Sequence, residues 1–208
     1  MTTLSKNILA FLSESATRKN SSRPVLQYIY YIPEHRELVS TDSFRLHRVS
    51  MDLWDSPLCF DTKGNQVSME GKKFPSYKSF FPESEKHDAL IDIDVLKNMD
   101  YIMKPFQYHS IINFDNGTIR NNKSYVYNNL VSFEIVYHFI KPNGKKYPEH
   151  DIWINVHYLY NAIRYFAKTS KNWLTLASIQ SKDALAPQAL HGTIDGLQSS
   201  ALIMPLKI

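Results

Sequence analysis

The sequence predicts an α+β protein in which helices pack on antiparallel sheets, in two successive units. Three observations lead to this class. Apolar residues recur at helical spacing in three segments. Short runs of strand-forming residues follow each of the first two segments, and turn signals separate those runs at hairpin distances. Because helix-then-strands is repeated, rather than a strict strand–helix alternation, the pattern favours antiparallel sheets over one parallel sheet.

The first unit, residues 1–82, begins with a helix whose apolar residues, from Leu4 to Leu12, recur at helical spacing. Strand-like runs then cover residues 25–32, 37–44, 45–51, 57–62 and 65–70. Pro75 and Pro82 bracket a stretch that fits neither a regular helix nor a central strand, so we expect an extended connector. A domain boundary is predicted near Pro82.

The second unit, residues 83–208, repeats this order. Asp92 or Asp94 is a candidate cap for a helix whose apolar face runs to Phe106. A further helix is expected from about Asn155. Strands are expected at 110–120, with a hairpin turn at 116–117, and at 131–139, 173–180 and 200–208.

Composition and charge exclude several classes of protein. Hydrophobic residues make up 43% and charged residues 21% of the 208 residues, which is typical of a globular protein and not of a disordered chain. No apolar run is long enough to span a membrane, and no signal-peptide pattern is present, so we expect a cytoplasmic protein without membrane association. The single Cys59 fits a reducing compartment. The 24 basic and 20 acidic residues give a net charge of +4, which permits contact with nucleic acid without requiring it.

Motifs for catalysis and cofactor binding are missing from the sequence. It contains no Walker loop, GxGxxG, HExxH or CxxC pattern. The tightest group of potential metal ligands is Glu149-His150-Asp151, which we interpret as solvated side chains beside a turn. Cys59, between apolar neighbours, is interpreted as a buried, inert thiol. We therefore expect no catalytic residue, no metal site and no cofactor.

Basic residues lie on the outward faces of the expected helices. They are Lys6 on the first helix, Lys97 and Lys104 on the second, and Arg164 and Lys168 on the third. Spacing alone favours ordinary solvated faces. The alternative is a surface that contacts DNA phosphates without reading bases, since basic residues on helices neutralise backbone charge regardless of sequence.

Five short segments, in order, resemble the bacterial DNA polymerase sliding clamp family, the β processivity factors. SRPVL at 22–26 resembles the family's TRPVL, STDSFRL at 40–46 resembles ATDGHRL, and FPSY at 74–77 resembles FPDY. INVHYL at 154–159 is similar to FNVSYL, and LIMPLKI at 202–208 is similar to VVMPMRL. Each motif is short, but together they span nearly the whole chain.

The resemblance implies a DNA clamp-like fold with two of the family's three domains. Residues 1–82 correspond to a shortened middle domain and residues 83–208 to a complete last domain. The family's extra strand and second helix between Leu46 and Phe74 are expected to be missing. Without a first domain, the family's usual subunit interface lacks one of its two halves. The resemblance therefore does not by itself predict a closed ring, and a homo-oligomer is one of the alternatives.

In the family, the groove between these two domains binds short hydrophobic peptides of polymerases and other replication or repair proteins. The matching groove positions in this chain are Thr41, Arg45, Leu46, Pro75, Phe80, Leu202, Met204, Pro205 and Leu206. The apolar C-terminal run agrees with this assignment, because it must be buried or must line an apolar pocket. The plainer interpretation is that it is only the last core strand.

The leading hypothesis is therefore a non-enzymatic, clamp-like accessory protein of DNA replication or repair that binds partner peptides and contacts duplex DNA through its helices. A second hypothesis is a clamp mimic that keeps the groove and recruits or competes for clamp partners without encircling DNA. A third is a small metal-dependent DNA-processing enzyme. The third requires a convergent cluster of acidic residues, and Asp42 has no partner that can be identified in the sequence.

Overall fold

The computed structural model of the chain describes residues 4–17, 22–52, 54–81, 89–92, 109–113, 118–125, 131–138, 151–169, 173–178 and 187–206. Its helical elements are α1 (Lys6–Glu14), α3 (Val156–Thr169) and the short 3₁₀ elements η1 (Pro24–Gln27) and η2 (Lys78–Phe80). The strands of the first half are β1 (Ile29–Ile32), β2 (Glu37–Thr41), β3 (Arg45–Ser50), β4 (Leu58–Phe60) and β5 (Gln66–Val67). Those of the second half are β6 (Ala89–Asp92), β7 (His109–Asn113), β8 (Thr118–Tyr125), β9 (Val131–His138), β10 (Ile152–Asn155), β11 (Trp173–Ser178), β12 (Gln188–Ile194) and β13 (Leu197–Ile203).

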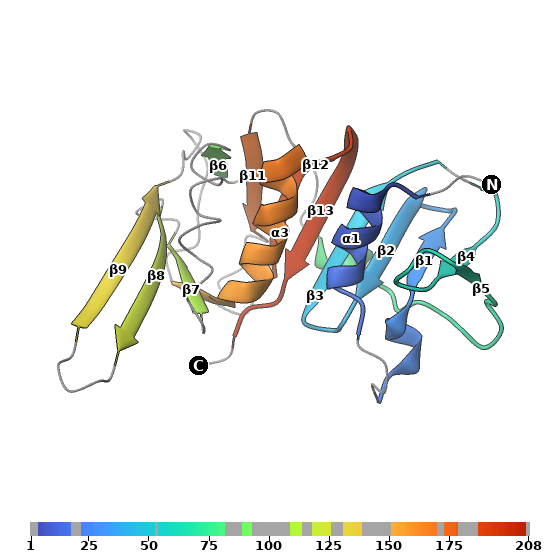
Figure 1. Cartoon of the computed structure of the whole chain (residues 1–208), viewed down its shortest axis with the longest axis horizontal. Coiled ribbons are helices and arrows are strands. Elements are labelled where there is room, and N and C mark those ends of the chain that lie inside the picture. The colour runs from blue at the N-terminus through green and yellow to red at the C-terminus, as the bar shows by residue number, and fades with distance from the viewer. Residues whose placement is uncertain are drawn as a thin grey trace.

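The strands form two antiparallel sheets, which confirms the predicted α+β class. The larger sheet has nine strands in the order β5-β4-β1-β2-β3-β13-β12-β11-β6, and the smaller has four in the order β10-β7-β8-β9 (Figure 1). The two halves of the sequence meet in the larger sheet at β3 and β13, where Leu46 lies opposite Leu202 and Val49 opposite Ser199. The larger sheet is therefore continuous across the domain boundary predicted near Pro82, and that boundary stays a prediction.

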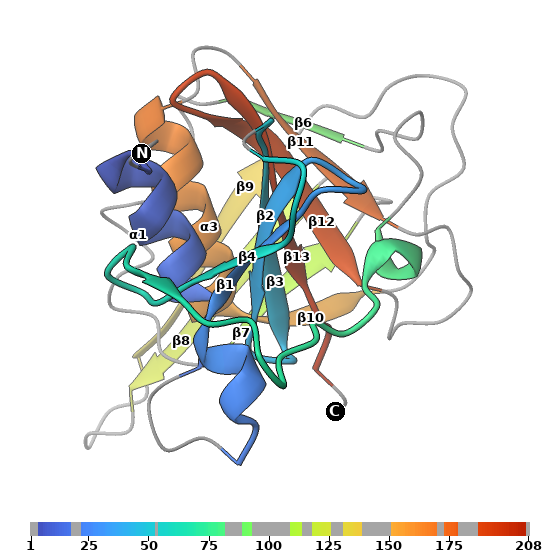
Figure 2. The ribbon, with the colours of Figure 1, turned by 90° about the vertical axis from the view of Figure 1, so that its right-hand side faces the viewer.

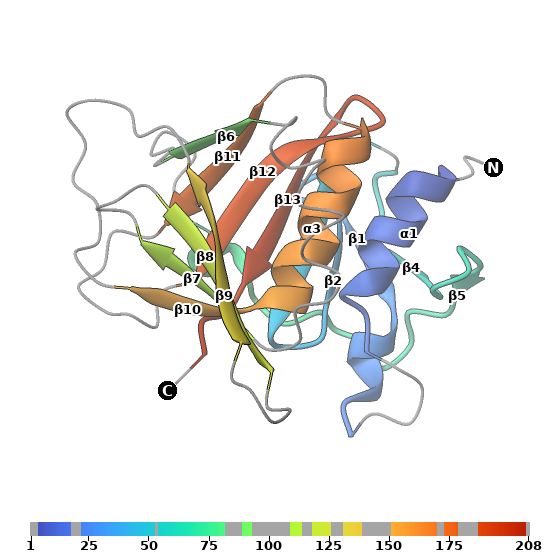
Figure 3. The same cartoon turned by 60° about the vertical axis from the view of Figure 1, so that its left-hand side comes forward.

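Helices α1 and α3 lie side by side on one face of the larger sheet (Figures 1 and 3). Each has one apolar face, and the residues on it are fully buried, as with Phe11 in α1 and Phe166 in α3. Their ring centroids are 5.3 Å apart. At the polar edge of this contact, the Glu14 carboxylate accepts hydrogen bonds from Asn161 Nδ2 at 3.0 Å and Arg164 Nη2 at 2.9 Å. Apolar packing and hydrogen bonds between α1 and α3 thus join the N-terminal and C-terminal halves of the chain.

The opposite face of the larger sheet carries a second, smaller core. Successive side chains of a strand point to opposite faces, so Tyr31 packs toward the helices while Tyr30 packs away from them. The second core is covered by Tyr77 and Phe81 of the segment that follows β5. This segment crosses the face opposite the helices (Figure 2). One face of the sheet is thus covered by helices and the other by a largely irregular segment.

Several predicted elements have the expected type and shifted bounds. The first and third helices are confirmed as α1 and α3. Asn155 caps α3, since its side-chain oxygen accepts a hydrogen bond from the His157 amide at 2.9 Å. Strands β7 and β8 pair as the hairpin prediction requires, with Asn113 opposite Thr118, while turn residues 114–117 lie outside the described residues. Asp92 ends β6, and the helix expected after it also lies outside them.

Two expectations were wrong in detail. Residues 25–27 belong to η1 and not to a strand, because Pro24 fixes a helical backbone angle and the Leu26 amide bonds to the Arg23 carbonyl at 3.0 Å. The strand begins only at Ile29. The connector around Pro75 is not extended throughout, since η2 forms one short turn within it. Between positions 46 and 74, the described residues, all but position 53, contain strands and no helix.

None of the helices in the described ranges is both long and apolar enough to cross a membrane.

Candidate functional site

A cleft of about 420 Å³ opens on the face of the larger sheet that the helices leave uncovered. Four segments that are far apart in the sequence form its walls: the start of η1, the turn between β2 and β3, the connector, and the end of β13. The lining residues are Arg23, Val25, Leu26, Thr41, Ser43, Arg45, Leu46, Lys73, Pro75, Ser76, Tyr77, Phe80, Leu202 and Met204. The pairing of β3 with β13 brings the turn and the C-terminal segment together.

Most of the groove positions expected from the sequence lie in this cleft. Seven of them line it: Thr41, Arg45, Leu46, Pro75, Phe80, Leu202 and Met204. Pro205 and Leu206 follow directly along the chain and are not part of the lining. Sequence reasoning missed seven lining residues, all of which fall inside or beside the motifs that carried the resemblance: Arg23, Val25, Leu26, Ser43, Lys73, Ser76 and Tyr77. The binding role of this set stays a prediction.

The turn between β2 and β3 is held rigidly by its own side chains. The Asp42 carboxylate accepts hydrogen bonds from the amides of Phe44 and Arg45 and from Arg45 Nε, each at 3.0 Å. Thr41 Oγ1 donates to the Arg45 carbonyl at 2.7 Å. Ser43, with φ of 80°, takes the left-handed conformation in this turn. Because so many bonds close the turn, its cleft-facing residues are positioned before any ligand binds.

The segment after β13 runs between this turn and the smaller sheet. The Met204 amide donates to the Phe44 carbonyl at 2.9 Å, and the Leu206 amide donates to the Trp153 carbonyl at 2.7 Å. Pro205 lies opposite Ile154 of β10. The Arg45 guanidinium stacks on the Tyr158 ring of α3, 4.4 Å from its centroid. Contacts from both halves of the chain therefore fix this end of the cleft.

A buried carboxylate fastens the connector to the sheet. Glu37 at the start of β2 accepts hydrogen bonds from Tyr77 Oη at 2.6 Å, Lys78 Nζ at 3.0 Å and Arg48 Nη1 at 3.3 Å. Arg48 also lies over the Phe81 ring, 3.8 Å from its centroid. Burial, followed by the hydrogen bond to the Glu37 carboxylate, raises the pKa of Tyr77 far above its ordinary value. Tyr77 thus stays a protonated donor, and the connector wall depends on Glu37.

Large apolar side chains are exposed around this cleft. Among the described residues, those with the greatest exposure are Phe44 at 62%, Phe80 at 46% and Leu206 at 36%. All three belong to the turn, the connector or the C-terminal segment. Apolar side chains gathered beside a cleft are typical of a surface that docks a ligand or another chain.

The basic residues expected to contact DNA have different surroundings. Lys6 on α1 and Lys168 on α3 are exposed. Arg164 is half-buried, pairs with Glu14 at 2.9 Å and lies over the Tyr165 ring, 4.9 Å from its centroid. Lys97 and Lys104 lie outside the described residues.

A carboxylate also lies close to Lys168 and to the start of α1. Asp195 accepts hydrogen bonds from Ser5 Oγ and, at 2.7 Å, from Asn7 Nδ2. These bonds, followed by the charge of Lys168, lower the pKa of Asp195. The face formed by α1 and α3 thus carries both signs of charge.

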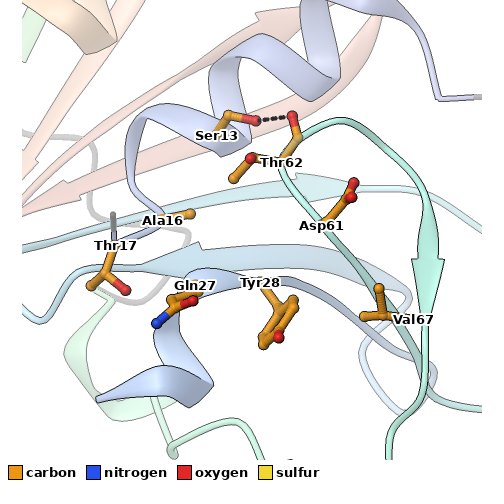
Figure 4. A pocket seen from close by; sticks show the side chains of 8 residues that line it. All are labelled: Ser13, Ala16, Thr17, Gln27, Tyr28, Asp61, Thr62 and Val67. Atoms are coloured by element: carbon orange, nitrogen blue, oxygen red, sulfur yellow. Dashed lines mark hydrogen bonds between the residues drawn. The ribbon is translucent and has the colours of Figure 1, made fainter. Parts of the chain in front are cut away.

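A second cavity, of about 620 Å³, lies between the end of α1 and the turn that joins β4 to β5. Figure 4 shows the side chains around it, with Ser13 Oγ donating to the Thr62 carbonyl at 3.1 Å. Its lining is mostly small or polar, and its one ionisable carboxylate, Asp61, is engaged with the amides of Lys63 and Asn65. None of the exposed large apolar side chains among the described residues belongs to its lining, so the cleft beside Met204 is the better candidate site.

Potential catalytic groups do not gather in the described part of the chain. No three His, Cys, Asp or Glu side chains there are placed to share a metal ion. Asp151 pairs with Arg120 at 2.9 Å, while Glu149 and His150 lie outside the described residues. Cys59 is fully buried, as expected, and burial raises the pKa of its thiol to about 11.

Comparison with known proteins identifies the fold. No protein-family model matches the chain, and no curated protein matches it in sequence. The DNA polymerase sliding clamp of Pseudomonas aeruginosa, solved with a ligand, matches with a TM-score of 0.67 at 15% identity, over 100% of this chain and 66% of the clamp. The β chain of DNA polymerase III from Streptococcus pneumoniae gives 0.67 at 14% identity, over 98% and 62%. The β subunit from Thermotoga maritima gives 0.65 at 11% identity, over 97% and 63%.

The chain therefore has a clamp-like fold, and it spans slightly less than two thirds of the length of these clamps. This confirms the fold that the sequence motifs indicated. It also confirms that the fold is a shortened form of the one in the solved clamps.

Proposed function

We propose that the protein is a non-enzymatic, clamp-like accessory protein of DNA replication or repair that binds short hydrophobic peptides of polymerases or other partners. One observation carries this proposal. Segments that resemble clamp motifs, and that are distant in sequence, line a single cleft and place exposed apolar side chains around it. The fold shared with sliding clamps supports the setting of replication or repair.

The cleft has the physical properties that peptide binding requires. Val25, Leu46 and Leu202 form apolar walls, and burying one leucine- or phenylalanine-sized anchor contributes roughly 1.5–3 kcal/mol. The turn and the connector are already fixed by hydrogen bonds to Asp42 and Glu37. A peptide therefore has little of the protein to order when it binds, which favours affinity.

The test is binding of a labelled peptide that contains Gln followed by Leu and Phe anchors, measured by calorimetry. Met204→Ala trims one wall and leaves the backbone pairing intact, so we expect a loss of about 2 kcal/mol, roughly thirtyfold in affinity. Met51→Ala is the matched control, because Met51 packs against the core on the helix side of the sheet. Absence of binding by the wild type, or full affinity in Met204→Ala, contradicts the proposal.

We also propose contact with duplex DNA through the exposed face of α1 and α3. Lys6 and Lys168 are exposed on two adjacent helices, whereas the charge of Arg164 is largely offset by Glu14. Contact of this kind is weak, independent of sequence and reduced by salt. We expect the double variant Lys6→Gln, Lys168→Gln to lose retention on duplex DNA at low salt, and each single variant to lose part of it, with Lys63→Gln as the control for the single variants. Unchanged retention returns these residues to an ordinary solvated face.

Association of copies of the chain is an additional prediction that rests on the clamp resemblance. Its test is the mass of the protein in solution, with and without the peptide. A single monomeric species under both conditions rejects a homo-oligomer.

A further inference from the structure

The charges that line the cleft all have one sign. Its basic side chains are Arg23, Arg45 and Lys73, and the described residues that line it include no carboxylate. Arg45 is already paired with Asp42 at 3.0 Å, and Arg23 donates to the Ser43 hydroxyl at 2.8 Å. Lys73 is exposed and forms no ion pair with the described part of the chain. The cleft thus combines apolar walls with an excess of positive charge.

We infer that the natural occupant of the cleft is an acidic peptide, one that carries Asp or Glu next to its apolar anchors. This inference rests on the proposed function and specifies the partner's chemistry. Positive charge at the mouth of a low-dielectric cleft attracts a negatively charged ligand and disfavours a basic one. Lys73 is exposed on the connector side of the cleft, so a carboxylate near it gains attraction while the anchors enter the cavity.

The apolar lining distinguishes this occupant from a nucleic acid. Phosphate contacts need only accessible basic and polar groups, whereas this cleft also has aliphatic walls formed by Val25, Leu46 and Leu202. Those walls match leucine or phenylalanine anchors, which a phosphate–sugar backbone lacks. The helix face carrying Lys6 and Lys168 is on the other side of the sheet. The observations therefore favour an acidic peptide over a DNA strand at this site.

The experiment uses two labelled peptides with the same Gln, Leu and Phe anchors, one with Asp at two flanking positions and the other with Asn. Fluorescence anisotropy with the full chain gives the affinity of each at low and at high salt. We expect the Asp peptide to bind about fivefold more tightly at low salt, which is the size of an exposed charge interaction. The two affinities should converge at high salt, because mobile ions screen exposed pairs.

Variants of the protein locate the effect. Lys73→Gln should bring the affinity of the Asp peptide close to that of the Asn peptide. Lys63→Gln removes one charge from another exposed lysine, in the turn that joins β4 to β5, and should leave the difference intact. Far-ultraviolet circular dichroism of each variant checks that the fold is kept.

Each outcome decides a separate point. If both peptides bind with equal affinity at low salt, the inference is wrong and the proposed function stands. If neither peptide binds, the proposed function itself fails. If a duplex oligonucleotide displaces the Asp peptide, and Lys73→Gln loses that displacement, the positive charge serves nucleic acid and the inference is also overturned.

Discussion

The two faces of the larger sheet are covered in different ways. Helices α1 and α3 seal one face with an apolar stripe each, and side chains such as Phe11 and Phe166 are fully buried there. The other face is covered by a proline-containing connector that touches the sheet mainly through Tyr77 and Phe81. A helix presents side chains at regular intervals and leaves no gap, whereas an irregular segment covers only where its few anchors reach. The cleft is the part of the sheet that the connector leaves open.

The same substitution made on each face tests this difference most strongly. Phe166→Ala empties a fully buried site and should lower the free energy of unfolding by about 3–5 kcal/mol. Phe80→Ala removes a side chain that is 46% exposed and should change it by no more than about 0.5 kcal/mol while weakening peptide binding. Urea denaturation measures the first quantity and anisotropy the second. Similar stability losses in both variants refute the distinction between the faces.

The second prediction concerns the hydrogen bonds that attach the connector to Glu37. Glu37→Ala leaves the mostly buried Arg48 without its carboxylate and should cost roughly 3 kcal/mol of unfolding free energy. It should also weaken peptide binding, because Tyr77 and Lys78 lose their acceptor. Tyr77→Phe is the milder companion, removing one hydrogen bond at a cost of about 1 kcal/mol. Retained peptide affinity in Glu37→Ala shows that the wall does not depend on this carboxylate.

The helix-covered face should respond to acid through His47. This side chain is fully buried and stacks on Phe11 with ring centroids 4.2 Å apart, and burial lowers its pKa to about 3. In the unfolded chain the pKa is near 6.5, so between these values the unfolded state binds more protons. Stability should therefore fall as pH drops through this window, by up to about 1.4 kcal/mol per pH unit.

His47→Leu serves as the comparison for this pH dependence. We expect its unfolding free energy to change little between about pH 6.5 and 5, a window above the ordinary titration of carboxylates. Urea denaturation at a series of pH values gives both slopes. Equal slopes for the wild type and His47→Leu contradict the assignment. A ring that becomes protonated near pH 6 in the folded protein, seen by NMR, contradicts it independently.

The smallest effect on stability is expected at the rim of the cleft. Leu206 is 36% exposed and is held through its backbone amide, so Leu206→Ala should change unfolding free energy by no more than about 0.5 kcal/mol. If the rim contacts the peptide, affinity falls severalfold while stability stays constant. Unchanged affinity restricts the binding surface to the lining that ends at Met204.

Local patterns in the sequence were sufficient for elements that depend on local forces. Apolar residues at helical spacing, from Leu4 to Leu12 and again after Asn155, predicted the two described helices. Short motifs placed seven groove residues on one cleft. Contacts between residues that are far apart in the sequence could not be predicted from local patterns. Arg164 was predicted to face outward, and its partner Glu14 is 150 positions away.

The connector shows the same limit. Its two prolines excluded regular structure, but its path over the sheet depends on Glu37, which is 40 positions before Tyr77. Sequence reasoning therefore missed Tyr77 as part of the lining. Lys73 was missed because a lysine beside a loop motif carries no local sign that it borders a cavity.

The junction between β3 and β13 has a consequence for how the chain folds. The two strands lie side by side in the middle of the sheet, yet about 150 residues separate them along the chain. Until β13 arrives, β3 has one unpaired edge, with free amides and carbonyls that can pair with another chain. Contacts of such large sequence separation form late and slowly. The centre of the finished sheet is thus an exposed edge until β13 pairs with β3, and aggregation during refolding should begin there.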